Sequence, residues 1–251
     1  MTALDHLVRP DVPTTGWATA QGRRRVSADA ATARTATGRF AVAVADGVGD
    51  TPAAAQAARL AVAVAADEAW GADAAGAPPA VRHALADTAP TVPVSRLPHQ
   101  ATAAVAPPDA GAGDTTYAVA AGDRDGWCVV WVGDCRAYFM PQTPGATALP
   151  LTADHTIGQY LRERGVRAAP RLDRVVTTTA RKGVPGWAAG PPGPGRLVLV
   201  TNGVHHLLDA GAIARTAGAA ADPAEAARLL VAAALDAGGT DNAAAAVADL
   251  H

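Results

Sequence analysis

Short valine-rich runs recur along the chain, each bounded by glycine, asparagine or aspartate. The run at 40–45, FAVAVA, is followed at once by Asp46-Gly47. Apolar runs of this length between turn residues are typical of buried strands. We therefore predict strands at 40–45, 115–121, 127–132, 136–140, 196–201 and 243–249.

Alanine-rich stretches between these runs predict helices. Thr51-Pro52 opens the longest stretch, and a threonine N-cap with proline at the first helical position is a strong helix start. Asp222 provides a similar N-cap near the end of the chain. We expect helices at 51–70, 80–89 and 223–237.

The remaining segments are rich in proline and glycine. Residues 91–113 are ambiguous, and 141–195 contain only two short regular pieces, at 157–164 and 174–179. A long irregular stretch in a compact domain is usually functional. Helices lie between runs of strands rather than after each strand, which favours an α+β architecture over a doubly wound parallel fold. We expect a loose N-terminal leader at 1–14 and a single domain at 15–251.

Composition narrows the class of protein. Of the 251 residues, 49% are hydrophobic but only 4% are aromatic, so the core must consist of alanine, valine and leucine. A net charge of −2 argues against a protein that coats nucleic acid. No apolar run reaches the roughly 20 residues that span a bilayer, and Cys128 and Cys135 fit neither a disulfide framework nor a common zinc pattern. We expect a monomeric cytoplasmic protein that binds neither nucleic acid nor membrane.

Acidic or amide residues stand at the ends of the predicted strands. Asp46 and Asn202 follow strands, and Asp241 precedes the last one. Each such dipeptide alone is an ordinary turn, but carboxylates at strand ends can converge at one sheet edge, where a cation offsets their repulsion. Oxygen ligands without histidine or cysteine select hard ions such as Mg²⁺ or Mn²⁺.

The order and flanks of these residues resemble those of a known family, the metal-dependent protein phosphatases of type 2C. The resemblance extends over about 15–250. The matching segments, in order, are QGRRRVSADA, VADGVGD, AGDTTYAV, VWVGDCRAYFM, LTADHT, RVVTTTA, PGRLVLVTNGVHHLL and GGTDNAAAAVADL. The resemblance implies a two-sheet antiparallel β-sandwich flanked by helices, with the site at one edge.

Carried onto the matching positions, the resemblance implies a site for two Mn²⁺ or Mg²⁺ ions, or fewer if the site is degenerate. Asp46 would bridge the two ions, and the carbonyl of Gly47 would bind one of them. Asp241 would be a further ligand, and Asp29 would support the side of the first motif. Asp134 matches a position that is linked to a weaker third metal in bacterial members.

The implied activity is hydrolysis of phosphoserine or phosphothreonine in a protein or peptide. A hydroxide shared by two ions would attack phosphorus in line, so no protein nucleophile is needed. Arg24 would hold the substrate phosphate, because a planar guanidinium meets two oxygens at once.

Three positions depart from the family pattern. Asn202 replaces an aspartate, and as a ligand it offers only a neutral carbonyl oxygen. Ala28 stands where an acid is usual, and Asp50 replaces a glycine. We expect the Asp50 carboxylate to be solvated rather than to return charge to the site. These departures leave two alternatives open, a pseudophosphatase that acts as a regulatory binding module and a diverged phosphatase for a small metabolite.

The histidines are weaker candidates. Adjacent residues of a helix point about 100° apart, so we expect His205 and His206 to be poorly placed for joint metal binding. For His155 we expect a role in loop structure rather than in catalysis.

Overall fold

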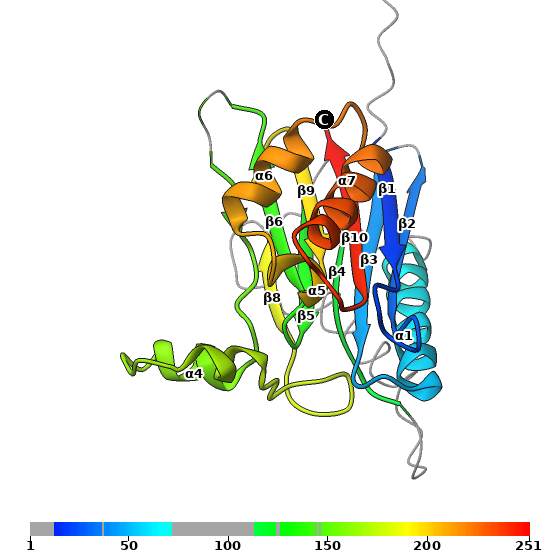
Figure 1. Cartoon of the computed structure of the whole chain (residues 1–251). Helices are drawn as coiled ribbons and strands as arrows, with labels where there is room; N and C mark the ends of the chain where they lie inside the picture. The colour runs from blue at the N-terminus through cyan, green and yellow to red at the C-terminus, as the bar shows by residue number, and fades with distance from the viewer. Residues whose placement is uncertain (1–12, 37, 72–112, 124–125, 144, 146) are drawn as a thin grey trace, which may run out of the picture.

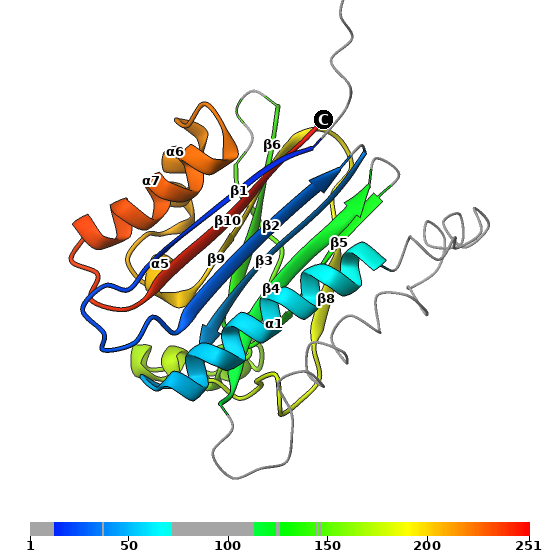
Figure 2. The same ribbon diagram turned by 90° about the vertical axis from the view of Figure 1, so that its right-hand side faces the viewer.

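The computed structural model describes residues 13–36, 38–71, 113–123, 126–143, 145 and 147–251. Two five-stranded antiparallel sheets pack face to face, with helices on their outer faces (Figures 1 and 2). The α+β fold with a two-sheet sandwich flanked by helices is therefore confirmed. No helix in the described part of the chain has the length and apolar character needed to cross a membrane.

Each sheet is formed from strands that are distant in sequence. The first sheet has the order β1 (Thr14–Ala20), β10 (Ala243–Leu250), β9 (Gly195–Val200), β6 (Arg136–Pro141) and β7 (Leu149–Pro150). The second has the order β2 (Asp29–Ala36), β3 (Arg39–Gly47), β4 (Thr115–Asp123), β5 (Gly126–Val132) and β8 (Gly186–Ala189).

Helices cover both sheets and lie in the connections between strands. They are α1 (Pro52–Gly71), α4 (Ile157–Arg162), the 3₁₀ helix η1 (Pro170–Arg174), α5 (Asn202–His205), α6 (Ala210–Gly218) and α7 (Pro223–Asp236). The Thr51 hydroxyl accepts a hydrogen bond from the amide of Ala54 at 3.1 Å. Asp222 caps α7 in the same way through the amide of Glu225, so both predicted N-caps are present.

Three layers of apolar side chains hold these elements together. Between the sheets, Val42 and Val44 of β3 pack with Leu197 and Leu199 of β9. On the outer faces, alanines of α1 cover the second sheet, while α6 and α7 cover the first. Most of these side chains are alanine or valine, as the low aromatic content requires, and the small residues let helices and strands approach closely.

Several elements differ from the sequence-based predictions. The strands β1, β2, β7 and β8 and the helices α5 and α6 were not predicted. The predicted regular piece at 174–179 is wrong, since this segment holds only the end of η1 and isolated bridges. The expected helix at 80–89 lies outside the described residues, as do residues 1–12 of the expected leader, and Thr14 already belongs to β1.

Candidate metal and phosphate site

Asp29 and Asp46 lie opposite each other on neighbouring strands. Asp29 begins β2, Asp46 stands one residue before the end of β3, and the two are direct partners in the antiparallel register. The amide of Gly47 donates to the Ala28 carbonyl at 3.1 Å, which fixes this end of the strand pair. A Cβ at Gly47 would lie 2.5 Å from the Ala54 carbonyl oxygen, so only glycine fits here.

The side-chain amide of Asn202 contacts one acid of this pair, Asp46, and lies near a third acid, Asp134. Its Nδ2 donates to Oδ2 of Asp46 at 2.5 Å and approaches Oδ2 of Asp134 at 3.5 Å. The preceding residue, Thr201, donates its hydroxyl to Oδ2 of Asp29 at 2.6 Å instead of capping α5. The junction of β9 and α5, at the end of a strand of the first sheet, therefore supplies hydrogen-bond donors to Asp29 and Asp46 of the second sheet.

Asp134 comes from the tight turn between β5 and β6. Gly133 adopts a positive φ of 86°, and a Cβ there would lie 2.2 Å from the Thr116 side chain. The Asp134 side chain is 2% exposed, and its Oδ1 has no hydrogen-bond partner among the described residues. A buried carboxylate oxygen without a partner carries a large desolvation penalty, so this atom marks a position suited to a cation.

The 151–156 segment supports the turn that carries Asp134. Nδ1 of His155 accepts a hydrogen bond from the Gly133 amide at 3.3 Å, and its ring stacks on Trp131. Asp154 accepts two hydrogen bonds from the Arg136 guanidinium, at 2.8 and 2.7 Å. These contacts give His155 a structural role, in agreement with the expectation from sequence.

Arg24 and Asp241 meet at the rim of the site. Nη2 of Arg24 donates to Oδ2 of Asp241 at 2.7 Å, and both side chains are nearly half exposed. The neighbouring Asn242 is buried, and it accepts from the Ala28 amide at 2.8 Å and donates to the Gln21 carbonyl at 2.6 Å. The loop before β10 therefore fixes the backbone on both sides of Arg24.

Asp50 holds the same loop from the other side. Its carboxylate accepts hydrogen bonds from the backbone amides of Arg25 and Val26, at 3.2 and 2.9 Å. The half-buried Asp50 carboxylate is therefore not simply solvated, as was expected, but accepts from the backbone beside Arg24.

The electrostatics of the acids reflect their burial. Desolvation raises the pKa of Asp29 to about 7, with the charges of Asp241 and Asp134 adding to the effect. Desolvation and then the charge of Asp29 raise the pKa of Asp46 well above its ordinary value. Burial raises the pKa of Asp134 to about 6, assisted by Asp154. Joint ionisation of these acids is therefore unfavourable unless a cation compensates their charge.

His205 and His206 lie beside Asp134. One ring nitrogen of each and a carboxylate oxygen of Asp134 lie within 4.8 Å of one another, and the two rings meet edge to face at 4.7 Å. The expectation that the two histidines are poorly placed for joint metal binding is therefore wrong. Burial lowers the pKa of His205 well below its ordinary value and also lowers that of His206.

The structure thus brings the predicted site residues to one edge of the sandwich. Asp29 and Asp134 are buried there, Asp46 and Asn202 are half-buried, and Arg24 and Asp241 form the rim. Their roles as ligands remain predictions. Sequence reasoning missed the supporting residues, which are Thr201, His205, His206 and Asn242. Thr201 and Asn242 could have been found from the sequence, because each is adjacent to a predicted site residue.

No protein-family model matches the sequence, and no curated protein resembles it significantly. Solved structures are similar across nearly the whole chain. The serine/threonine phosphatase PstP of Mycobacterium tuberculosis superposes with a TM-score of 0.74 at 22% identity, covering 96% of this chain and 99% of that one.

Two further structures extend the comparison. The catalytic domain of PstP in complex with two manganese ions gives a TM-score of 0.72 at 22% identity and covers 95% of this chain and 99% of that one. The phosphatase MsPP of Mycobacterium smegmatis in complex with cacodylate gives 0.68 at 26% identity, with coverage of 95% and 98%. Together with the sheet order and the strand-end acids, these similarities show that the chain has the fold of the PPM, or type 2C, serine/threonine phosphatases.

Proposed function

We propose that this chain hydrolyses phosphoserine and phosphothreonine esters of proteins with Mn²⁺ or Mg²⁺. The observation that carries the proposal is the cluster of Asp29, Asp46 and Asp134. Asp29 and Asp46 are paired across β2 and β3, and one Asn202 amide lies against both Asp46 and Asp134. Bringing like charges together away from water is unfavourable unless a cation or a proton compensates them, so the cluster supports a cation site.

The donor set fits hard divalent ions. Asp46 and Asp241, with the Gly47 carbonyl and support from Asp29, would hold the ions through oxygen, which Mg²⁺ and Mn²⁺ prefer. When bound, the ions supply a nucleophile from water at neutral pH and neutralise phosphoryl oxygens. Asn202 fits only if its amide turns by 180°, so that Oδ1 rather than Nδ2 faces Asp46 and the ion.

Arg24 is the residue that we assign to the substrate phosphate. Its guanidinium is half exposed at the rim and uses Nη2 for Asp241. The loop around it is held by Asp50 and Asn242. Because the backbone is fixed while the side chain reaches solvent, the guanidinium can present a planar pair of donors to two phosphoryl oxygens.

The experiment is a hydrolysis assay on a phosphothreonine peptide and on an aryl phosphate, with Mn²⁺ and with EDTA. We expect turnover with Mn²⁺ and none with chelator. Arg24→Ala should raise KM for the peptide, and Arg24→Lys should restore it only partly, because lysine lacks the guanidinium fork. Arg23→Ala, on the same loop, is the control.

Equal rates with and without EDTA would overturn the metal requirement. Faster turnover of small phosphate esters than of the peptide would instead favour a metabolite as the substrate. A KM change in Arg23→Ala with none in Arg24→Ala would move the phosphate contact to the neighbouring residue.

A second candidate function is that of a binding module without turnover. It is favoured by two contacts, the Asn202 amide on Asp46 at 2.5 Å and Arg24 on Asp241 at 2.7 Å. The Arg24 guanidinium balances the charge of Asp241, and the Asn202 amide occupies an oxygen of Asp46 that would otherwise be free to bind metal. Calorimetric titration with Mn²⁺ separates the two functions, because a binding module of this kind should retain phosphopeptide affinity in EDTA and take up Mn²⁺ weakly.

A further inference from the structure

Asp134 stands between two different environments. Its Oδ2 approaches the Asn202 amide on the side of the acidic cluster. Its Oδ1 is buried without a hydrogen-bond partner among the described residues, and the histidine pair lies within 4.8 Å of its carboxylate. The all-oxygen ligand set implied by the sequence does not use these histidines.

The protonation of His205 is fixed by one contact. Nε2 lies 2.8 Å from the backbone carbonyl oxygen of Asp134, and a carbonyl can only accept, so Nε2 carries the proton. Nδ1 then has a lone pair, and it is buried without a partner in the part of the chain that the structure describes. Histidines that bind metals usually donate their other N–H to a carbonyl or carboxylate in this way.

Charges of both signs surround the histidine pair. Arg136 and Arg174 carry positive charge that opposes a cation here, but Arg136 is paired with Asp154 through two hydrogen bonds, at 2.8 and 2.7 Å. The geometry of the site is two imidazoles beside one buried carboxylate.

We propose that Asp134, His205 and His206 form a binding site for a first-row transition metal ion such as Zn²⁺, which adjoins the oxygen-only site at Asp46 and shares Asp134 with the acidic cluster. Two imidazoles and one carboxylate are ligands that zinc sites use, with a further position open to water. Imidazole favours Zn²⁺, Co²⁺ or Ni²⁺, whereas Mg²⁺ prefers carboxylates and water. The site does not depend on the proposed hydrolysis.

The test uses Co²⁺ as the probe, because Co²⁺ with nitrogen ligands absorbs visible light and Zn²⁺ displaces it. The full chain is titrated with Co²⁺ in saturating Mg²⁺, which occupies the oxygen-only site. We expect a visible band that Zn²⁺ removes. His206→Gln should weaken Co²⁺ binding at least about tenfold, whereas His251→Gln, at the exposed end of the chain, should leave it unchanged.

Two further variants keep the test decisive. Asp46→Asn should retain the band while losing hydrolysis, which separates this site from the proposed function. His205→Gln should abolish the band, and a thermal melt shows whether that variant folds; if it does not, His206→Gln decides alone. Absence of the band in the wild type, or equal affinity in His206→Gln and His251→Gln, would overturn the proposal.

Discussion

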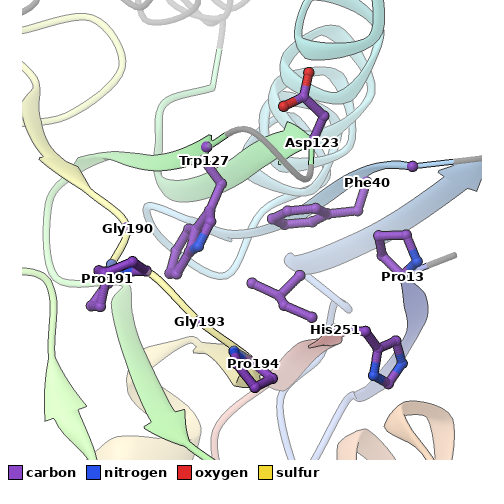
Figure 3. Close-up of a pocket in the computed structure, with 13 residues that line it drawn as sticks. Pro13, Phe40, Asp123, Trp127, Gly190, Pro191, Gly193, Pro194 and His251 are labelled. Carbon is purple, nitrogen blue, oxygen red and sulfur yellow. The ribbon is translucent and has the colours of Figure 1, made fainter. Parts of the chain in front are cut away.

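The two ends of β3 differ in the side chains that they remove from water, which are aromatic at the start of the strand and acidic at its end. At its start, Phe40 meets Trp127 edge-on at 6.3 Å, and Trp127 packs against Phe139 at 5.4 Å. Figure 3 shows Phe40 and Trp127 lining a pocket together with prolines and His251. At its other end, Asp46 faces Asp29. The first end stabilises the fold through apolar contacts, whereas the second buries charge at the expense of stability, which is what a site for a cation requires.

The largest expected effect comes from Asp46→Asn at the acidic end. Loss of this carboxylate should reduce Mn²⁺-dependent hydrolysis by more than about 100-fold, because changes in the supporting residues of metal sites already reduce affinity or activity about 10–100-fold. The same variant should melt at a higher temperature than the wild type without metal at pH 8, since it removes an unfavourably buried charge. Activity assays and thermal melts measure both effects.

Asp236→Asn is the matched control for this variant, because it removes a carboxylate at the exposed end of α7. It should change neither activity nor melting temperature appreciably. If Asp46→Asn destabilised the metal-free protein instead, the distinction between the two ends of β3 would fail.

Phe139 packs at the apolar end of β3, and Phe139→Ala should have the opposite effects to Asp46→Asn: it should lower stability and leave Mn²⁺ affinity unchanged. Phe139 is 1% exposed, and truncation of a buried phenylalanine costs about 3–5 kcal/mol in unfolding free energy. Urea unfolding measures this loss. Below the unfolding transition, Mn²⁺ affinity should equal that of the wild type, and a parallel loss of affinity would show that the two ends are energetically coupled.

Asn202→Asp makes the acidic end more strongly charged. The new carboxylate should tighten Mn²⁺ binding about 10–100-fold and raise turnover, because it replaces a dipole by an anionic ligand. Without metal the variant should be less stable than the parent, and excess Mn²⁺ should reverse this order by mass action. Calorimetry and paired melts test both.

Gln142→Glu is the control for Asn202→Asp, since it makes the same chemical change at an exposed position after β6. It should affect neither Mn²⁺ affinity nor rate. If Asn202→Asp behaved like this control, Asn202 would not limit the site, and the binding-module function would gain support.

The pH dependence of the metal-free protein tests the same comparison without any substitution. Asp29 and Asp134 have folded-state pKa values raised to about 7 and about 6. Between the ordinary carboxyl pKa and these values, the folded state holds protons that the unfolded chain has released, so stability falls as pH rises. Melting temperatures without metal should therefore fall from about pH 5 to pH 8, and Mn²⁺ should abolish most of this decline. A rise over this range would contradict the burial of these acids.

The sequence predicts the strands that carry a valine run or, like β10 (AAAAVADL), follow a clear turn sequence, and it misses strands with neither signal. β3 and β9 are valine- and leucine-rich and end in turn dipeptides, whereas β1 (TTGWATA) and β2 (DAATARTA) consist mainly of alanine and threonine. Alanine has little preference for strands, so only pairing with β10 and β3 defines these two. The sequence also misses α6, because its glycines obscure the helical pattern of apolar residues.

In the site, the acids at strand ends could be predicted because the strands position them. The role of Asp50 could not, because the need of two backbone amides for an acceptor is visible only after the loop has folded. The approach of His205 and His206 could not be predicted, because helical periodicity gives the direction of each Cα–Cβ bond but not where the two rings come to lie.

The register that pairs Asp29 with Asp46 also affects the size of the ion that the proposed metal site can bind. Directly opposed residues of antiparallel strands have Cα atoms about 4.5–5.5 Å apart, and the ladder resists any change in that spacing. Calcium sites are usually built on flexible loops that allow ligand distances of about 2.3–2.6 Å, whereas Mg²⁺ requires about 2.0–2.1 Å and a stricter geometry. In the proposed metal site, two paired strands limit how far Asp29 and Asp46 can move apart, so we expect Ca²⁺ to bind more weakly than Mg²⁺ or Mn²⁺, which a competition titration measures.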